Sequence, residues 1–176
     1  MDLQFSKSVC QCLRKVTCQA VNQEQTQEIR LPDTLPDIGR VLGSWGQVVV
    51  RGKEWRGNGM SVAGGVMVWV LYASEDAAST EVIEGWIPLQ MKWDFPQTQR
   101  DGAICVLPLL KAVDARSVSA RKIMIRVTVS AQGMAQEPME QDIYSPVEVP
   151  RDVQLLRRKY PVELPMEAGE MSFQME

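Results

Sequence analysis

Cysteine is the most chemically reactive residue type in this chain, because histidine is absent altogether. Without an imidazole there is no Ser–His or Cys–His pair to activate a nucleophile, and no histidine-ligated metal. Four cysteines remain, but zinc sites built from four thiolates usually pair two CxxC motifs. In this chain one residue separates the first two cysteines and the fourth is remote: Cys10, Cys12, Cys18 and Cys105. We therefore expect free thiols, buried or half-buried, with no bound metal and no cofactor.

The carboxylates offer no clear acid–base pair. General acid–base catalysis needs two carboxylates that converge in a cleft with shifted pKa values. The candidates all lie beside predicted turns, where solvated side chains are the default: Glu75, Asp76, Asp94, Asp101 and Asp114. The glycine-rich stretches GSWG and AGGV lack the GxxxxGK[ST] spacing of a phosphate-binding loop. We expect no catalytic residue, and hence no enzyme.

Recognition by tryptophan is the chemistry that remains. The chain has five tryptophans against three tyrosines and three phenylalanines. We expect Trp69 and Trp93 in the core, and Trp45, Trp55 and Trp86, which neighbour glycines and turns, at the surface. Aromatic side chains on a β surface form either protein interfaces or platforms that stack carbohydrate. Both alternatives stay open at this point.

Two arginines, Arg116 and Arg121, flank a Ser/Ala stretch in the segment VDARSVSARK. They are candidates for binding an acidic partner or a phosphate. The alternative, which we favour, is a polar turn in which the arginines cap the ends of two strands. The net charge of −3 gives no electrostatic reason to expect nucleic acid or an anionic membrane as a partner.

The hydrophobic pattern contains no apolar run near the roughly 20 residues of a membrane span. Residues 1–8 also lack the apolar core of a signal peptide. We therefore expect no membrane insertion and a location in the cytoplasm.

The elements that must position these residues are strands. Residues 48–55 and 60–73 are predicted to pair as a hairpin, with Asn58 and Gly59 in its turn. The second arm is apolar on both faces, which is typical of a central strand, and Gly64-Gly65 suggests a bulge or a bend within it. Pro88 and Pro108 lie in later strands, and each removes a ladder donor, so these strands should be edges or be bent.

The alternation from Ile123 to Ala131 is the clearest in the chain and predicts a strand with one wet face. Residues 13–21 are predicted as a strand, because their β-branched content outweighs a helical alternative. Residues 135–150 are rich in proline and acid and predict a linker with at most a short edge strand. Roughly seven strands without alternating helices indicate an all-β, mostly antiparallel fold, a β-sandwich or a partly closed barrel.

The triplet Leu-Pro-Asp occurs twice, at residues 31–33 and 35–37. Pro32 and Pro36 each favour extended geometry in the preceding leucine. Asp37, before Ile38, resembles the N-cap of one short helical turn over residues 37–43. We interpret the stretch as a structural elbow between the first strand and the hairpin.

The domain organisation is predicted as one β domain over residues 1–150, followed by residues 151–176. A weak likeness between residues 12–29 and 155–173 suggests that this tail is a linker and the start of a truncated second copy. A C-terminal strand that packs on the first domain is the alternative. Homodimers through a sheet edge or through the tail are also candidates.

Four motifs in order resemble the SPOCS domain family of sporulation proteins in endospore-forming Firmicutes. They are the doubled LPD element at residues 31–38, the VLY triplet at 70–72 before an acidic loop, GWIPL at 85–89, and ARK at 120–122. The resemblance covers about residues 10–135 and implies a non-catalytic role in spore-envelope or spore-coat assembly. The implied partners are other spore-envelope proteins, in the mother-cell cytoplasm or at the forespore surface. The alternative function is a carbohydrate- or peptidoglycan-binding β module that uses surface tryptophans.

Overall fold

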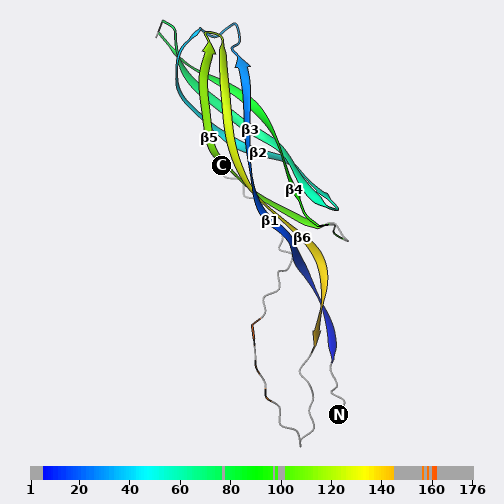
Figure 1. Ribbon diagram of the computed structural model, residues 1–176. Helices are drawn as coiled ribbons and strands as arrows, with labels where there is room; N and C mark the ends of the chain where they lie inside the picture. Colours follow the sequence, from blue (N-terminus) through cyan, green and yellow to red (C-terminus); the bar gives the residue numbers. More distant parts are fainter. Residues whose placement is uncertain are drawn as a thin grey trace, which may run out of the picture.

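The structure is a computed structural model that describes residues 6–76, 78–96, 98, 102–144, 156, 158, 160 and 161. The described chain contains strands and no helix. The six strands are β1 (Lys7–Arg30), β2 (Ile38–Arg56), β3 (Gly59–Ser74), β4 (Thr80–Asp94), β5 (Ala103–Ser119) and β6 (Lys122–Tyr144). Figure 1 shows them as long, twisted ribbons in an elongated molecule.

The strands form two antiparallel three-stranded sheets, ordered β1-β6-β5 and β2-β3-β4. The sheets pack face to face as a β-sandwich and do not close into a barrel, which decides between the two predicted architectures. β2 lies beside β5 along one side of the sandwich, and β1 lies beside β4 along the other. The chain therefore crosses between sheets twice, after β1 and after β4.

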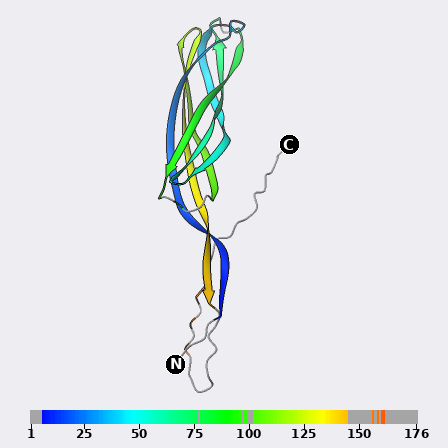
Figure 2. The ribbon, with the colours of Figure 1, turned by 90° about the vertical axis from the view of Figure 1, so that its right-hand side faces the viewer.

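β1 and β6 run beyond the other four strands as a twisted two-stranded ribbon (Figures 1 and 2). Their pairing continues from Arg30 opposite Lys122 to Lys7 opposite Tyr144, whereas β5 pairs with β6 only as far as Gln136. Residues 135–144, predicted as part of a linker, are thus the end of the central strand of a sheet. That prediction was wrong because the proline and acidic residues face solvent or β1 without interrupting the ladder.

The core lies between the two central strands. Alternate residues of β3 and β6 point inward and are almost completely buried: Val66, Val68, Val70 and Tyr72 on β3, and Ile123, Ile125, Val127 and Val129 on β6. On β6 this is the alternation that the sequence predicted. β4 contributes one face of larger side chains, Ile83, Ile87, Leu89, Met91 and Trp93.

Trp93 connects the sheets at the end of the core near the ribbon. Its indole N–H donates to the carbonyl of Gln19 on β1, at 3.0 Å, and its ring lies against Gly133 on β6. A Cβ atom at Gly133 would lie 2.6 Å from Trp93 Cε2. The glycine therefore makes room for the largest side chain of the core.

The predicted hairpin and both proline edges are confirmed. β2 and β3 pair antiparallel around a turn at Gly57 and Asn58, one residue earlier than expected. β4, which carries Pro88, and β5, which carries Pro108, are both edge strands. The irregularity near Gly64-Gly65 belongs to β2 instead of β3, because the register shifts between Val50 and Gly52 while the β3–β4 ladder stays regular.

The helical turn predicted over residues 37–43 does not exist, because β2 begins at Ile38. The Ile38 N–H donates to the carbonyl of Ala120, 2.8 Å away, and Ile38 pairs with Ser74 on β3. Asp37 is engaged by an arginine and does not cap a helix. The predicted boundary near residue 150 and most of the segment 151–176 lie outside the described residues.

The tight packing at Gly133 gives a test of the core. Gly133→Ala should lower the free energy of unfolding by about 1–3 kcal/mol, because the indole of Trp93 leaves no room for a methyl group. Gly52→Ala is the matched control, since a Cβ there meets no atom within 4 Å. Urea denaturation of both variants makes the comparison, and equal stability of the two would contradict the packing described.

Candidate functional site: an aromatic face

Three of the five tryptophans lie on the outer surface of the sheet β2-β3-β4, together with other apolar side chains and the exposed Gln47 and Glu84. Trp45 on β2 lies opposite Trp69 on β3, and Trp86 on β4 lies opposite Met67 on β3. The next row places Leu71 beside Val82. We call the surface made by these six residues the aromatic face: Trp45, Met67, Trp69, Leu71, Val82 and Trp86. Trp45 is 48% exposed and Val82 47% exposed.

The two central strands differ in their outward side chains, although the edge strand β5 of the other sheet exposes Leu107 and Leu109. From Ala63 to Ala73 the outward residues of β3 include no charged or polar side chain: Ala63, Gly65, Met67, Trp69, Leu71 and Ala73. The equivalent residues of the other central strand are mostly polar: Lys122, Met124, Arg126, Thr128, Ser130, Gln132, Met134 and Gln136. An antiparallel sheet with one face in the core normally has a polar face outside. Only β6 follows this rule.

Trp86 does not extend straight into solvent from its edge strand. Its ring lies over Gly65 of β3, where a Cβ atom would collide with indole atoms. Any side chain at residue 65 would therefore push the indole away from the sheet. The glycine lets Trp86 lie flat over the central strand and widen the aromatic face.

Arg51 covers this tryptophan in turn. It lies in β2 at the point where the register shifts, and its Cζ is 4.1 Å from the centroid of a Trp86 ring. A guanidinium over an indole is a favourable cation–π arrangement. Among the described residues no carboxylate forms an ion pair with Arg51. Glu54, opposite Ser61, is the acidic residue nearest to Arg51 in register, and it pairs with Arg56 at 2.9 Å. Glu84 lies further along the sheet, opposite Trp69.

The structure brings some of the predicted surface tryptophans together and separates another. Trp45 and Trp86 share the aromatic face, but Trp55 belongs to the opposite side of β2 and packs on Phe95, with ring centroids 5.0 Å apart. Trp93 is in the core as predicted, whereas Trp69 is half-buried on the aromatic face and not in the core. The alternation of Trp69 with the buried valines on either side of it was the signal that could have placed it correctly.

The two candidate arginines also lie apart. Arg116 is on the outer surface of the sheet β1-β6-β5, where it contacts the sulfur of Met124 at 3.4 Å. It lines a hollow of about 290 Å³ in which Arg126 faces Asp114, at 3.2 Å, and Glu24, at 3.9 Å. Opposite charges are already paired in this hollow, so it shows no excess of positive charge for an anion.

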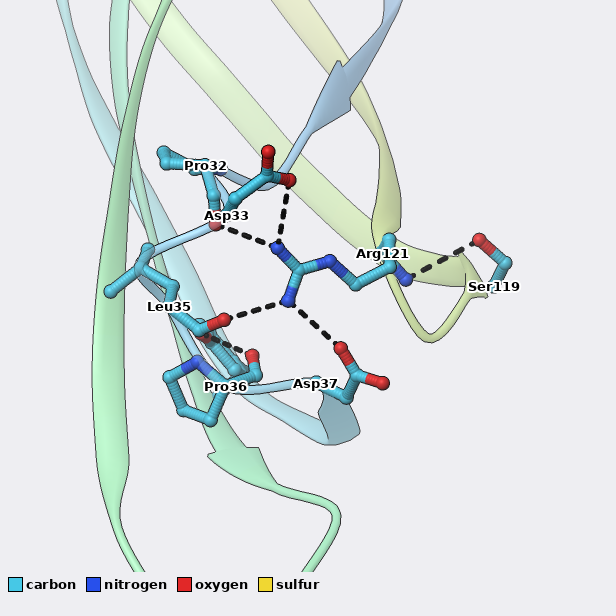
Figure 3. A network of polar contacts seen from close by, with 8 residues as sticks. Pro32, Asp33, Leu35, Pro36, Asp37, Ser119 and Arg121 are labelled. Atoms are coloured by element: carbon cyan, nitrogen blue, oxygen red, sulfur yellow. Dashed lines mark hydrogen bonds and ion pairs between the residues drawn. The ribbon is translucent and has the colours of Figure 1, made fainter.

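Arg121 lies in the two-residue turn between β5 and β6 and binds the elbow (Figure 3). Nη1 donates to the carbonyl of Leu35, at 2.7 Å, and to Oδ1 of Asp37, at 2.8 Å. Nη2 donates to the carbonyl of Pro32, at 2.8 Å, and lies 3.5 Å from Asp33 Oδ1. One guanidinium thus contacts both LPD triplets, and the hydrogen bond to Asp37 raises the pKa of Arg121.

Backbone and tyrosine contacts complete this attachment. The N–H of Leu31 donates to the carbonyl of Arg121 and the hydroxyl of Tyr72 donates to the carbonyl of Pro36, at 2.9 and 3.0 Å. The elbow that was predicted from Pro32, Pro36, Asp37 and Ile38 therefore joins the two sheets. The sequence predicted that Arg121 either binds a partner or caps a strand end. In the structure it holds the elbow in place.

The remaining candidates for chemistry stay dispersed. All four cysteines are free, and Cys18 and Cys105 are exposed, which differs from the expectation of buried or half-buried thiols. Within the described residues no cluster of three or more cysteines and carboxylates could hold a metal ion. Glu75 and Asp76 lie in the β3–β4 turn, Asp94 ends β4, and Asp101 is outside the described residues.

Comparison with known proteins adds no relative: the chain matches no protein-family model, no curated protein and no solved structure. In the part of the chain that the structure describes, no helix has the length and apolarity needed to cross a bilayer. The class of protein is therefore defined by the structure alone: it is a β-sandwich with one aromatic outer face.

The buried phenol of Tyr72 gives a test by pH. Burial raises the pKa of Tyr72 above its ordinary value of 10.0, nearby Glu81 and Asp37 also raise it, and Arg121 opposes them. Because the native pKa is raised, the neutral phenol stabilises the fold at lower pH, and this contribution is lost as the pH rises through the raised value.

Ultraviolet absorbance measured against pH follows this ionisation, with circular dichroism to confirm the native sheet. The difference in absorbance between the wild type and Tyr72→Phe isolates the phenol of Tyr72, and it should appear at a higher pH in the native protein than in the urea-unfolded protein. Equal midpoints in the two states would contradict the buried hydrogen bond.

A double-mutant cycle tests the attachment of the elbow. Arg121→Ala and Asp37→Ala should each lower the denaturation midpoint, and the double variant should lose less than the sum, because the residues share an ion pair. Arg56→Ala is the control, since its pair with Glu54 is exposed and should contribute little. Additive effects at Arg121 and Asp37 would show that their contact contributes no coupling.

Proposed function

We propose that this chain is a non-catalytic interaction module of a spore-envelope assembly protein, and that it binds other proteins through the aromatic face. The observation that carries the proposal is the outward surface of β3, which is apolar where the equivalent surface of β6 is polar. A contiguous apolar patch on a soluble fold marks an interaction site more often than chance.

The composition of the patch supports a protein as the partner. Protein interfaces are enriched in tryptophan, methionine and arginine, and hot spots are enriched in tryptophan and arginine. The aromatic face combines Trp45, Trp69, Trp86 and Met67 with Arg51, which covers Trp86 at one end of the face. All six outward residues are carried by strands of one sheet, so the surface is held rigid before binding.

The sporulation context rests on the resemblance to the SPOCS domain, carried by the motifs at residues 31–38, 70–72, 85–89 and 120–122. On this proposal the protein acts in the mother-cell cytoplasm or at the forespore surface, among other spore-envelope proteins. In the structure the first and last of these motifs meet, since Arg121 binds both LPD triplets. The two motifs are distant in sequence, but both contribute to this one structural contact.

A carbohydrate- or peptidoglycan-binding function is the second candidate, because Trp45 is exposed on a flat sheet and could stack a sugar ring. The proposal for a protein partner is favoured by the aliphatic side chains Leu71 and Val82 beside the tryptophans. Leu71 and Val82 add apolar surface that a protein partner can bury, but they have no aromatic ring on which a sugar could stack.

The test is made in spore-forming cells with the gene deleted and then restored as variants. Trp45→Ala should abolish localisation of a fluorescent fusion to the forespore, since truncation of a hot-spot tryptophan costs about 2 kcal/mol or more of binding. Leu109→Ala is the control, because Leu109 is 61% exposed on the other sheet. Normal, heat-resistant spores in the deletion strain would contradict the proposal, and so would unchanged localisation of the Trp45→Ala protein.

A further inference from the structure

We infer that the partner of the aromatic face is an extended, apolar protein segment that places a carboxylate on Arg51. The inference rests on the proposed function and adds to it the chemistry of the partner. The inference follows from the position of Arg51, whose placement over Trp86 is not needed to hold the fold together.

Arg51 stands at the end of the face opposite Leu71 and Val82, where Met67 and Trp86 form the last row. Its side chain starts from the edge strand β2, and its guanidinium covers Trp86, whose ring in turn covers Gly65 of the central strand. The charge is therefore stacked two layers above β3. Any partner that covers the three tryptophans must also cover this guanidinium.

Covering a charge is costly unless the charge is paired. An ionised group that loses its water needs an ion pair and hydrogen bonds in the complex. The described residues supply no carboxylate to Arg51, so the partner must supply one. A carboxylate suits the planar guanidinium because it can accept two parallel N–H bonds.

Glu84 determines where on the face that carboxylate lies. It is on β4 opposite Trp69, so it repels an acidic group placed over the Trp45–Trp69 row. The favourable arrangement puts the apolar side chains of the partner on Trp45 and Trp69, and its acidic group about one row further along, on Arg51. The spacing between rows is roughly 7 Å, two residues of a strand.

The shape of the face favours an extended segment. Three neighbouring strands give a surface without a deep groove in which a helix could lie, whereas sheets and strands stack on such surfaces about 10 Å apart. Binding of a second copy of the same chain is one of the outcomes that the test distinguishes. Nucleic acid is disfavoured by the net charge of −3.

The test uses a random peptide library displayed on phage, selected on the full chain. Peptides that bind the wild type and not Trp45→Ala should contain Asp or Glu next to apolar residues. A synthetic peptide from this set should lose roughly tenfold or more in affinity for Arg51→Gln, as expected when one partner of a buried charge pair is removed. Replacing the acidic residue of the peptide by its amide should cause a similar loss.

Arg51→Glu should reverse the selection and enrich Lys or Arg in the bound peptides. Arg30→Gln, which removes a similar charge from β1 on the other sheet, is the matched control and should bind the peptides like the wild type. Each variant is first checked for an unchanged denaturation midpoint.

The outcomes separate the inference from the proposed function. Trp45-dependent peptides that bind Arg51→Gln as well as the wild type would overturn the inference and leave the protein interface standing. A dimer in solution that Trp45→Ala dissociates would overturn it in favour of a second copy. No Trp45-dependent peptide, or Trp45-dependent binding on a glycan array instead, would overturn both.

Discussion

The guanidinium of Arg121 holds together the place where the chain first crosses from one sheet to the other. It lies in the β5–β6 turn and binds carbonyls and carboxylates of the elbow between β1 and β2. Tyr72 adds a hydrogen bond from β3, so three parts of the chain meet at one end of the sandwich. This attachment sets where β2 begins. Between that point and the row in which Trp45 stands opposite Trp69, the β2–β3 register shifts twice, after Ile38 and after Val41.

The two sheets then serve different purposes within one architecture. Both central strands bury one row of aliphatic side chains, and the resulting core accounts for the inward faces. Their outward rows differ: β6 faces solvent with polar side chains, whereas β3 adds tryptophan, methionine and leucine. Gly65 and Gly133 make these arrangements possible on opposite sides of the core, the first beneath Trp86 and the second beside Trp93. The aromatic face and the core therefore each depend on a glycine that leaves room for a tryptophan ring.

The sequence predicted the features that depend on local pattern. Alternation predicted β6, and the prolines indicated that β4 and β5 are edge or bent strands. It failed where a distant side chain decides the outcome. Asp37 looks like a helix cap by its neighbours, but Arg121 takes its carboxylate from 84 positions away. Trp45 and Trp86 could be proposed for the surface, but their union with Trp69 depends on strand register, and Arg51 depends on a register shift that no local pattern shows.

The central claim is that the aromatic face is covered when the protein acts. Oxidative footprinting of methionine and tryptophan side chains tests it most directly, by comparing the purified protein with the protein inside the cells that produce it. Met67 on the aromatic face and Met124 and Met134 on the opposite surface are all half-buried and so are comparable probes. We predict that Met67 and Trp45 react less in cells while Met124 and Met134 are unchanged. Equal reactivity of Met67 and Trp45 in both settings, or protection only of Met124 and Met134, would contradict this account.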